Sequence, residues 1–462
     1  MAESQGNKGR VRDARDDHNA RQVRHVRVVG GGLAGTEAAL QLADRGHQVT
    51  LYEMRGVRPT EAHRTDSLAE LVCSNTFKSE RTDTSSGAFK QELDLLGSRL
   101  LPLARKARVP GGHALALDRE LFGELVTEEV SQHPRIEVLR EEVTALDEGD
   151  PAIIATGPLT SPDLQQWLQG ITGNDALYFY DAIAPSLLLD SVDQEVVFRQ
   201  SRYDKGGADY LNCPMDKAEY EAFIDALLEA DRTELREFEK TAWFSGCMPI
   251  EAIAERGRES LRFGPMRPVG LTDPRTGRRP WAAVQLRQET RDGSLFGLVG
   301  FQTRLRYGDQ TRVFRMIPGL EQAEFVRLGS LHRNTYVDAP RTLNADLSLR
   351  ARDDLWLAGQ ITGCEGYVES LATGLVAALA VDARLAGRAF APPAGDSMLG
   401  SLLAYLRDTT TGRPSPMNVN FGLLPPLDPP VRDKRLRKEA HAARALESIR
   451  AWSREMLQEQ AG

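Results

Sequence analysis

Short apolar runs, helical apolar spacings and glycine turns alternate along much of the chain. An apolar run at residues 26–29 is short enough for a buried strand. A glycine-rich turn at residues 30–35 follows, and residues 36–45 carry apolar side chains at helical spacing until Gly46 ends the pattern. Residues 48–52 then predict a second strand. This order predicts a β-α-β unit with a glycine turn at its first junction.

The same patterns predict the main elements of the remaining chain. Residues 59–86 are polar and weakly periodic, which predicts a long loop. Residues 186–326 are richer in charge, aromatic residues and irregular turns, which predicts an inserted domain. Further helices are expected at residues 120–132, 369–385 and 432–459, and further strands at residues 136–139, 152–157 and 354–359.

Gly30, Gly32 and Gly35 have the spacing of the dinucleotide-binding fingerprint. The first glycine makes a tight turn, the second lets the backbone approach a pyrophosphate, and the third lets the helix pack closely on the strand. The helix N-terminus offers free N–H groups to the phosphates, and Glu53 ends the second strand where a carboxylate binds ribose hydroxyls. We therefore expect a dinucleotide to contact Gly30, Gly31, Gly32, Leu33, Ala34, Gly35 and Glu53.

A second glycine turn favours FAD over a nicotinamide as the bound dinucleotide. Gly359 and Gln360 begin this turn, directly after a predicted strand far down the chain. In large flavoproteins such a turn returns to the first one and covers the ribityl chain and the flavin, often with aspartate where Gln360 stands. The small-residue helix after Glu369 would then direct its N-terminus at the flavin pyrimidine edge.

These elements predict an α/β fold, with a Rossmann-like FAD-binding domain of the glutathione-reductase type and an inserted smaller α+β domain. We expect a disordered tail at residues 1–24 and the first part of the FAD-binding domain at residues 25–185. Residues 186–326 would form the insertion on the substrate side. Residues 327–462 would complete the FAD-binding domain and add the C-terminal helix.

Composition and charge narrow the class of protein. Of 462 residues, 41% are hydrophobic and 27% are charged, an ordinary globular composition with room for two domains. The net charge of −8 argues against general adhesion to nucleic acid or anionic membranes, but not against a local basic surface. The first 24 residues lack the apolar stretch of a signal peptide, and the most apolar helix is too short to span a bilayer. These features predict a cytoplasmic protein outside the membrane.

Four cysteines without a CxxC pair predict reduced thiols rather than a disulfide framework or a metal site. Polar, turn-forming residues flank Cys73 and Cys247, which makes both candidates for partly exposed, reactive thiols. Cys213 and Cys364 are expected to be buried and inert, as most free cysteines are.

Six segments identify a family. They are VVGGGLAGTEAA from Val28, LYEMR from Leu51, AELVCSNTFKS from Ala69, GCMPIEAIAERG from Gly246, LAGQITGCEGYVESLATGL from Leu357 and PMNVNFGLLPP from Pro416. With them the chain resembles the folate- and FAD-dependent tRNA (uracil-54-C5)-methyltransferases from about residue 26 to about residue 430. The AELVCSN and GCMPIE segments separate this family from other flavoproteins, including the related tRNA wobble-uridine flavoenzymes.

The resemblance implies transfer of a one-carbon unit from 5,10-methylenetetrahydrofolate to C5 of uridine 54 in the T-loop of tRNA. In this family the methylene passes through flavin N5, reduced FAD supplies electrons, and NADH or NADPH reduces the flavin again. A thiolate that adds at uracil C6 makes C5 nucleophilic, so the chemistry needs an activated cysteine. The resemblance assigns Cys247 as this nucleophile and Cys73 as a second catalytic thiol, either a proton carrier or a guard for the methylene-flavin adduct, although the roles of the two cysteines could be exchanged. It places Tyr367 beside the flavin or the pterin.

A local basic segment offers a surface for RNA in this acidic chain. Between Arg256 and Arg315 there are 13 arginines and no lysines against five acidic residues, a local charge of +8. Arginine binds phosphates and stacks on splayed bases, and Trp281 and Tyr307 lie among these arginines. Five basic residues near the start of the last predicted helix add to this charge. We therefore expect tRNA to bind the inserted domain.

Three other functions fit parts of the sequence. A relative that modifies another tRNA uridine would be expected to lack the cysteine of GCMPIE, which is present here. A non-catalytic protein that binds FAD and RNA has no need for two exposed thiols. An ordinary NAD(P)H oxidoreductase leaves the arginine segment unexplained. The sequence does not determine the oligomeric state.

Overall fold

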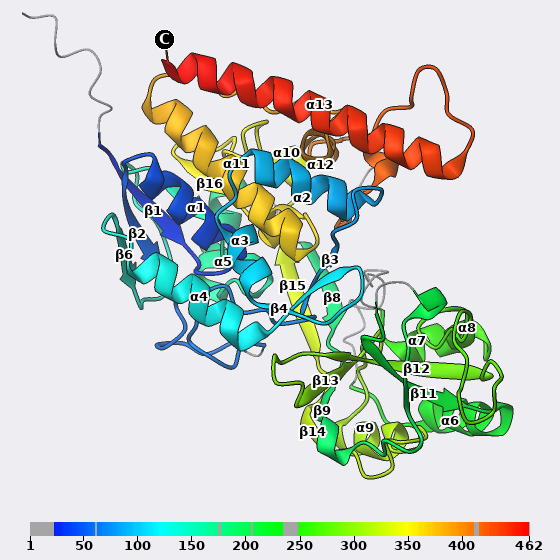
Figure 1. Ribbon diagram of the computed structural model, residues 1–462. Helices are drawn as coiled ribbons and strands as arrows, with labels where there is room; N and C mark the ends of the chain where they lie inside the picture. Colours follow the sequence, from blue (N-terminus) through cyan, green and yellow to red (C-terminus); the bar gives the residue numbers. More distant parts are fainter. Residues whose placement is uncertain are drawn as a thin grey trace, which may run out of the picture.

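The computed structural model describes residues 23–60, 62–173, 177–204, 207–233, 248–410 and 415–461. Within these ranges the chain forms two packed regions (Figure 1). The chain leaves the first region along strand β8 (Leu177–Ala182) and returns along β15 (Leu331–Tyr336), and these two strands pair antiparallel. The segment between them is therefore an insertion into the first region.

A five-stranded parallel sheet forms the centre of the first region, in the order β16-β7-β1-β2-β6. Its strands are β1 (His25–Val29), β2 (Gln48–Tyr52), β6 (Ile136–Leu139), β7 (Ala152–Ile154) and β16 (Leu355–Leu357). The strands are short, and β7 and the edge strand β16 are apolar and buried at every position. Such strands suit a parallel sheet, because helices cover both of its faces.

Helices and a small antiparallel sheet surround this parallel sheet (Figure 1). The helices are α1 (Leu33–Asp44), α2 (Ser85–Leu95), α3 (Leu100–Lys106), α4 (Arg119–Ser131), α5 (Pro162–Thr172), α10 (Ala339–Thr342), α11 (Tyr367–Leu385), α12 (Met398–Tyr405) and α13 (Lys434–Ala461). The small sheet has the order β3-β5-β4, with strands β3 (Thr76–Ser79), β4 (Arg108–Val109) and β5 (Ala114–Leu117). The prediction of a loop throughout residues 59–86 is wrong, because β3 and the start of α2 lie there. Their partners are distant in sequence, so local polarity hides them.

The insertion contains a six-stranded antiparallel sheet, in the order β10-β11-β12-β13-β9-β14. Its strands are β9 (Ser186–Leu188), β10 (Phe198–Arg199), β11 (Tyr210–Met215), β12 (Ala282–Gln288), β13 (Leu295–Leu298) and β14 (Phe325–Arg327). Its helices are α6 (Lys217–Glu229), α7 (Ile250–Glu255), α8 (Ser260–Phe263) and α9 (Tyr307–Phe314). This sheet has its own buried core, which includes Phe223, Val284 and Phe296. The predicted α/β fold with an inserted α+β domain is confirmed, and the boundaries at residues 186 and 326 stay predictions.

The two glycine turns meet at Ala34. A Cβ on Gly374, in the middle of α11, would lie closer than 3.0 Å to the Ala34 carbonyl oxygen, and a Cβ on Gly359 would lie 2.9 Å from the Ala34 Cβ. Close crossing of α1 and α11 therefore requires glycine at position 374. The later turn does return to the first one, as the sequence predicted. In the described part of the chain, no helix is both long and apolar enough to cross a membrane.

Glu92 is a buried carboxyl group that joins α2 to α12. It accepts hydrogen bonds from the N–H groups of Met398 at 2.7 Å and Leu399 at 2.8 Å, at the N-terminus of α12. Burial raises the pKa of Glu92 from 4.5 to about 8, although these hydrogen bonds act in the opposite direction. The folded protein therefore holds this proton more tightly than the unfolded chain does. The stability that Glu92 contributes is complete below pH 4.5 and is lost as the pH rises toward 8.

We expect the Glu92→Gln variant to lose this part of the pH dependence, since an amide does not ionise. Between pH 5 and pH 8 the variant should therefore gain stability relative to wild type, seen as a rise in its free energy of unfolding compared with that of wild type. Urea unfolding followed by circular dichroism at both pH values measures this difference. The same pH dependence in both proteins would contradict the role given to Glu92.

Candidate functional site

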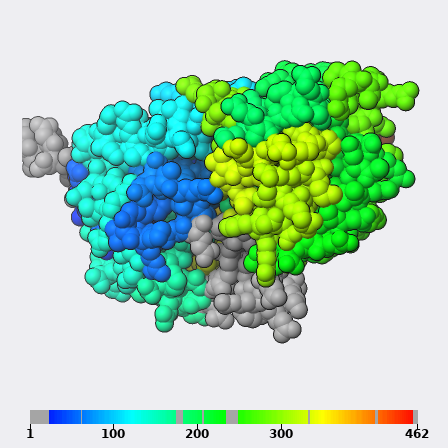
Figure 2. All heavy atoms as spheres, turned by 90° about the horizontal axis from the view of Figure 1, so that it is seen from below, coloured from blue at the N-terminus to red at the C-terminus, as the bar shows by residue number. Residues whose placement is uncertain are grey.

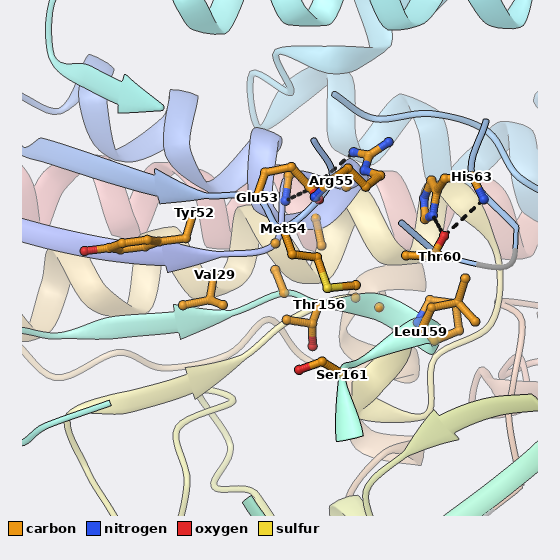
Figure 3. Close-up of a pocket in the computed structure, with 18 of the residues that line it drawn as sticks. Val29, Tyr52, Glu53, Met54, Arg55, Thr60, His63, Thr156, Leu159 and Ser161 are labelled. Carbon is orange, nitrogen blue, oxygen red and sulfur yellow. Dashed lines mark hydrogen bonds and ion pairs between the residues drawn. The ribbon is translucent and has the colours of Figure 1, made fainter. Parts of the chain in front are cut away.

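A cleft lies over the first glycine turn and encloses about 970 Å³ of empty space, its solvent-open mouth included. Its walls come from the glycine turn, the ends of β2 and β7, and the later glycine turn (Figure 3). We call it the dinucleotide cleft, because the glycine turn that predicts a dinucleotide site forms part of its wall. It is lined by these predicted cofactor residues: Gly30, Gly31, Gly32, Leu33, Ala34, Glu53, Gly359, Gln360 and Tyr367.

Gly35 is the one predicted cofactor residue that does not line the cleft. A Cβ at this position would overlap the carbonyl oxygen of Gly30, so Gly35 lets α1 pack on the preceding turn. Gly30 has a φ of +108°, and a Cβ there would lie 2.5 Å from the Ala155 carbonyl oxygen. Both positions therefore require glycine for backbone reasons.

The N-terminus of α1 opens into the cleft. Gly32 is its N-cap, and no side chain caps the helix's free N–H groups. A Cβ on Gly32 would meet nothing within 4 Å, so the backbone here is open to the cleft. Unpaired N–H groups and the positive end of the helix dipole make a site for phosphates. These residues fit the pyrophosphate of a dinucleotide.

Glu53 lies beside the phosphate end of the cleft and accepts three hydrogen bonds. The donors are the N–H of Gly31 at 2.9 Å, the N–H of Arg55 at 2.9 Å and Nη2 of Arg55 at 3.0 Å (Figure 3). Burial acts to raise the pKa of Glu53, but the hydrogen bonds and charge of Arg55, with the Gly31 N–H, lower the pKa below its ordinary value. Glu53 is therefore a carboxylate at neutral pH, the form that accepts ribose hydroxyls.

Arg55 is a buried residue of this site that the glycine and strand patterns of the sequence do not reveal. Its Nη1 donates to the Ser67 carbonyl at 2.8 Å and lies 3.4 Å from the Glu70 carboxylate. Glu70 also accepts the N–H groups of Arg64 and Thr65. The network fixes the polar loop at the edge of the cleft. Arg55 lies in the LYEMR segment and Glu70 in the AELVCSN segment. Because 15 positions separate the two residues, the sequence pattern does not reveal their contact.

A second cavity, with about 960 Å³ of empty space including its mouth, adjoins the dinucleotide cleft. Cys73 and Lys78 line it, and Gln360 and Tyr367 line both spaces. We call it the thiol cavity. Asn334, Asn418 and Gln302 line its other sides, so both regions of the chain contribute to it. The structure thus brings Cys73 beside the predicted flavin-side residues.

Tyr367 separates the two spaces. Its hydroxyl accepts the Cys73 N–H at 2.8 Å, and its ring centroid lies 5.8 Å from that of Phe77. Burial raises the pKa of Tyr367, so the phenol stays protonated. Because its hydroxyl accepts the Cys73 N–H, Tyr367 fixes the backbone of the cysteine segment against the edge of the cleft. Gln360, the other residue that lines both spaces, donates from its side-chain amide to the Glu365 carboxylate at 2.6 Å.

Cys213 and Cys364 differ from Cys73, which is partly exposed. Cys213 and Cys364 are buried, as predicted, and burial raises the pKa of both thiols, that of Cys364 to about 12. Cys247 lies outside the described residues. Ile250, three positions later, donates its N–H to the carbonyl of Gln302 at 2.8 Å. Since Gln302 lines the thiol cavity, this hydrogen bond joins Ile250 to a residue of the cavity wall.

Three arginines hold the cysteine segment. Arg119 donates to the Cys73 carbonyl at 3.4 Å, Arg327 donates to the Val72 carbonyl, and Nε of Arg287 donates to the Asn75 amide oxygen at 2.9 Å. Burial lowers the pKa of Arg327 to about 10, so this guanidinium is still charged at neutral pH. Sequence inspection missed Arg119 and Arg327. Arg119 also pairs with the Glu289 carboxylate at 2.9 Å, so these guanidinium groups serve to fix the backbone of the cysteine segment.

Most of the 13 arginines between Arg256 and Arg315 contact other groups of the protein, so fewer of them are available to bind RNA than their number indicates. Five of its arginines pair with carboxylates, namely Arg258, Arg262, Arg275, Arg304 and Arg312, and three donate to other protein oxygens, namely Arg287, Arg291 and Arg315. The remaining five, Arg256, Arg267, Arg278, Arg279 and Arg306, are exposed. Much of the positive charge therefore stabilises the insertion and its contact with the first region.

The fold and the cleft define a class of protein, the Rossmann-type flavoproteins that bind FAD. The family model described as glucose inhibited division protein A matches residues 25–389. Among solved structures, Aquifex aeolicus GidA in the form I crystal superposes with a TM-score of 0.68 at 16% identity, covering 93% of this chain and 76% of that one. At this identity the likeness shows the fold alone.

Curated relatives share a higher sequence identity with this chain than the GidA structure does. A methylenetetrahydrofolate--tRNA-(uracil-5-)-methyltransferase TrmFO of Azorhizobium caulinodans is 54% identical over 455 residues, 92% of this chain and 97% of the relative. One of Syntrophomonas wolfei is 50% identical over 435 residues, 94% of this chain and 100% of the relative. The chain belongs to the family of methylenetetrahydrofolate--tRNA-(uracil-5-)-methyltransferases.

Proposed function

We propose that the protein methylates C5 of uridine 54 in the T-loop of tRNA, in the cytoplasm. The carbon comes from 5,10-methylenetetrahydrofolate, and FAD, reduced by NADH or NADPH, provides the electrons. The observation that carries the proposal is the wall shared by the dinucleotide cleft and the thiol cavity. Tyr367 and Gln360 line both spaces, so a flavin at the end of the cleft would face the cavity that contains Cys73.

Each part of the site has a proposed role. The N–H groups at the start of α1 bind the FAD pyrophosphate, and Glu53 accepts the ribose hydroxyls. When bound, FAD supplies the redox chemistry and accepts the one-carbon unit from the folate. Leu33 and Ala34 line the cleft beside the phosphates, while Gly359 and Gln360 line it where the later turn crosses.

The two thiols act on the uracil ring. Cys247 adds to C6, which makes C5 nucleophilic, and Cys73 moves the proton that leaves C5. Contacts near both cysteines support this assignment. Tyr367 holds the Cys73 N–H, and the chain that follows Cys247 hydrogen bonds to Gln302 in the cavity wall. Arg119 and Arg327 hold the backbone of the cysteine segment through the carbonyls of Cys73 and Val72.

We also propose that the insertion, residues 186–326, forms the tRNA side of the molecule. Its exposed arginines, among them Arg256, Arg279 and Arg306, supply positive charge for phosphates in a chain of net charge −8. Residues 25–185 and 327–462 would then form the FAD-binding domain around the parallel sheet.

The test combines a spectrum with a product analysis. The purified protein should show the visible absorbance of a flavin. With methylenetetrahydrofolate, NADH and an unmethylated tRNA transcript, it should form 5-methyluridine, detected by mass spectrometry of nucleosides. A transcript with cytidine at position 54 is the matched control and should stay unmethylated. Flavin without 5-methyluridine would refute the methyltransferase, and product at another uridine would refute the proposed position.

A further inference from the structure

A third pocket lies where the first region meets the insertion, with about 660 Å³ of empty space including open solvent. Figure 2 shows this side of the molecule, where the blue surface of the early loop meets the yellow-green surface that includes β14 and α9. Ala62 and Arg64 line it from the loop, and Tyr307, Phe325, Val326 and Arg327 line it from the insertion. We call it the tyrosine pocket.

Two exposed hydrophobic residues, Tyr307 and Val326, lie in the mostly polar lining of the tyrosine pocket. The side chain of Tyr307 is 63% exposed and that of Val326 is 51% exposed, whereas large apolar side chains are usually buried. Trp281, the other aromatic residue noted in the arginine-rich segment, is different, because the guanidinium of Arg262 lies 3.7 Å from its ring centroid. The ring of Tyr307 is thus the one of these two that is open to a partner.

The charge around the pocket is positive. Arg64 is exposed, and no carboxylate of the described residues lies within ion-pair distance of its guanidinium. Arg306 precedes Tyr307 and is also exposed. Asp309, two residues after Tyr307 in α9, is paired with Arg312 at 2.6 Å. An exposed aromatic ring beside guanidinium groups suits an unstacked nucleobase and its phosphate.

The tyrosine pocket adjoins the thiol cavity. Ala62 lines both spaces. Arg327 lines the tyrosine pocket, and its guanidinium donates to the carbonyl of Val72, the residue before Cys73. A uridine whose ring enters the thiol cavity must leave its stack, and this exposes the base beside it. Since Ala62 lines both spaces, the tyrosine pocket is the space next to the thiol cavity that such a base would meet.

From these observations we propose that the tyrosine pocket binds the nucleotide next to the target uridine, with its base stacked on Tyr307 and its phosphate near Arg64. This inference rests on the proposed function. It makes Tyr307 a residue that positions the tRNA and does not take part in the chemical step. Its loss should therefore weaken tRNA binding more than it slows turnover.

Methylation kinetics of the holoenzyme test the proposal. Tyr307→Ala should raise the KM for tRNA about tenfold, the effect expected from one lost base–aromatic stack, with kcat changed less than about twofold. Tyr307→Phe keeps the ring and should retain the wild-type KM. Tyr203→Ala is the matched control, since Tyr203 is an equally large side chain, 52% exposed, outside this pocket. A Tyr307→Ala variant with the wild-type KM would overturn the subsite.

A fluorescent base gives a second readout that does not require turnover. T-arm hairpins carry 2-aminopurine directly 5′ or directly 3′ of the target uridine. Wild type and Tyr307→Phe should quench the fluorescence of one of the two hairpins, and Tyr307→Ala should not. Equal quenching by all three proteins would overturn the subsite. Absence of methylation by the wild-type protein would overturn the proposed function and the subsite together, whereas wild-type methylation with an unaffected Tyr307→Ala variant would overturn the subsite alone.

Discussion

Replacement of Cys73 by serine should lower the rate of 5-methyluridine formation about 10²- to 10⁴-fold, the range expected when a positioned proton carrier is lost. A serine hydroxyl has nearly the size of the thiol but stays protonated at neutral pH. The local structure should not change, because the contacts that hold this residue use its backbone. Tyr367 accepts its N–H, and Arg119 donates to its carbonyl. Flavin content, measured from the visible spectrum, should equal that of wild type.

Cys213→Ala is the matched control for Cys73→Ser. Cys213 is fully buried in the core of the insertion and lies in neither cavity. Its truncation should lower thermal stability slightly and leave the methylation rate per folded enzyme unchanged. Product is measured by mass spectrometry of nucleosides under single-turnover conditions. A Cys73→Ser variant as fast as wild type would contradict a catalytic role for Cys73.

The part of the site that sequence predicted well is the part with strict local spacing. A dinucleotide turn needs glycines at fixed positions between a strand and a helix, and Gly30, Gly32 and Gly35 lie there in the structure. Buried strands such as β7 and β16 were likewise visible as short apolar runs ending near glycine. The register and order of these strands depend on partners elsewhere in the chain, so periodicity alone does not give them.

The network around Cys73 could not be predicted from spacing. Asn75 donates to the carbonyls of Leu117 and Gln288, which lie in different regions of the fold. Arg327 approaches Val72 across more than 250 residues. Polar residues in such contacts look like an ordinary solvated loop in the sequence, because nothing local marks them as buried. For the same reason the polar pattern of residues 59–86 predicts a loop where β3 lies, since the hydrogen-bond partner of β3 is β5, which follows two intervening helices.

Gly374→Ala tests whether the crossing of α1 and α11 sets the shape of the dinucleotide cleft. Its methyl group would lie closer than 3.0 Å to three backbone atoms of Ala34, so α11 must move away from the first glycine turn. Backbone atoms do not yield as a flexible side chain does. Overpacking of this kind should cost about 3 kcal/mol of stability. Since Ala34 and Gly359 both line the cleft, the shift should also lower the flavin content of the purified protein.

Gly170→Ala makes the same chemical change in a different environment. Gly170 lies within α5, is exposed, and a Cβ there would meet nothing within 4 Å. Alanine should therefore raise stability by up to about 1 kcal/mol, because it limits the unfolded backbone and favours a helix. Thermal unfolding and the ratio of flavin to protein absorbance measure both variants. A lower unfolding midpoint for Gly374→Ala and a higher one for Gly170→Ala would separate the steric clash at Ala34 from the general preference of helices for alanine. A wild-type ratio of flavin to protein absorbance in Gly374→Ala would show that the crossing of α1 and α11 does not control the cleft.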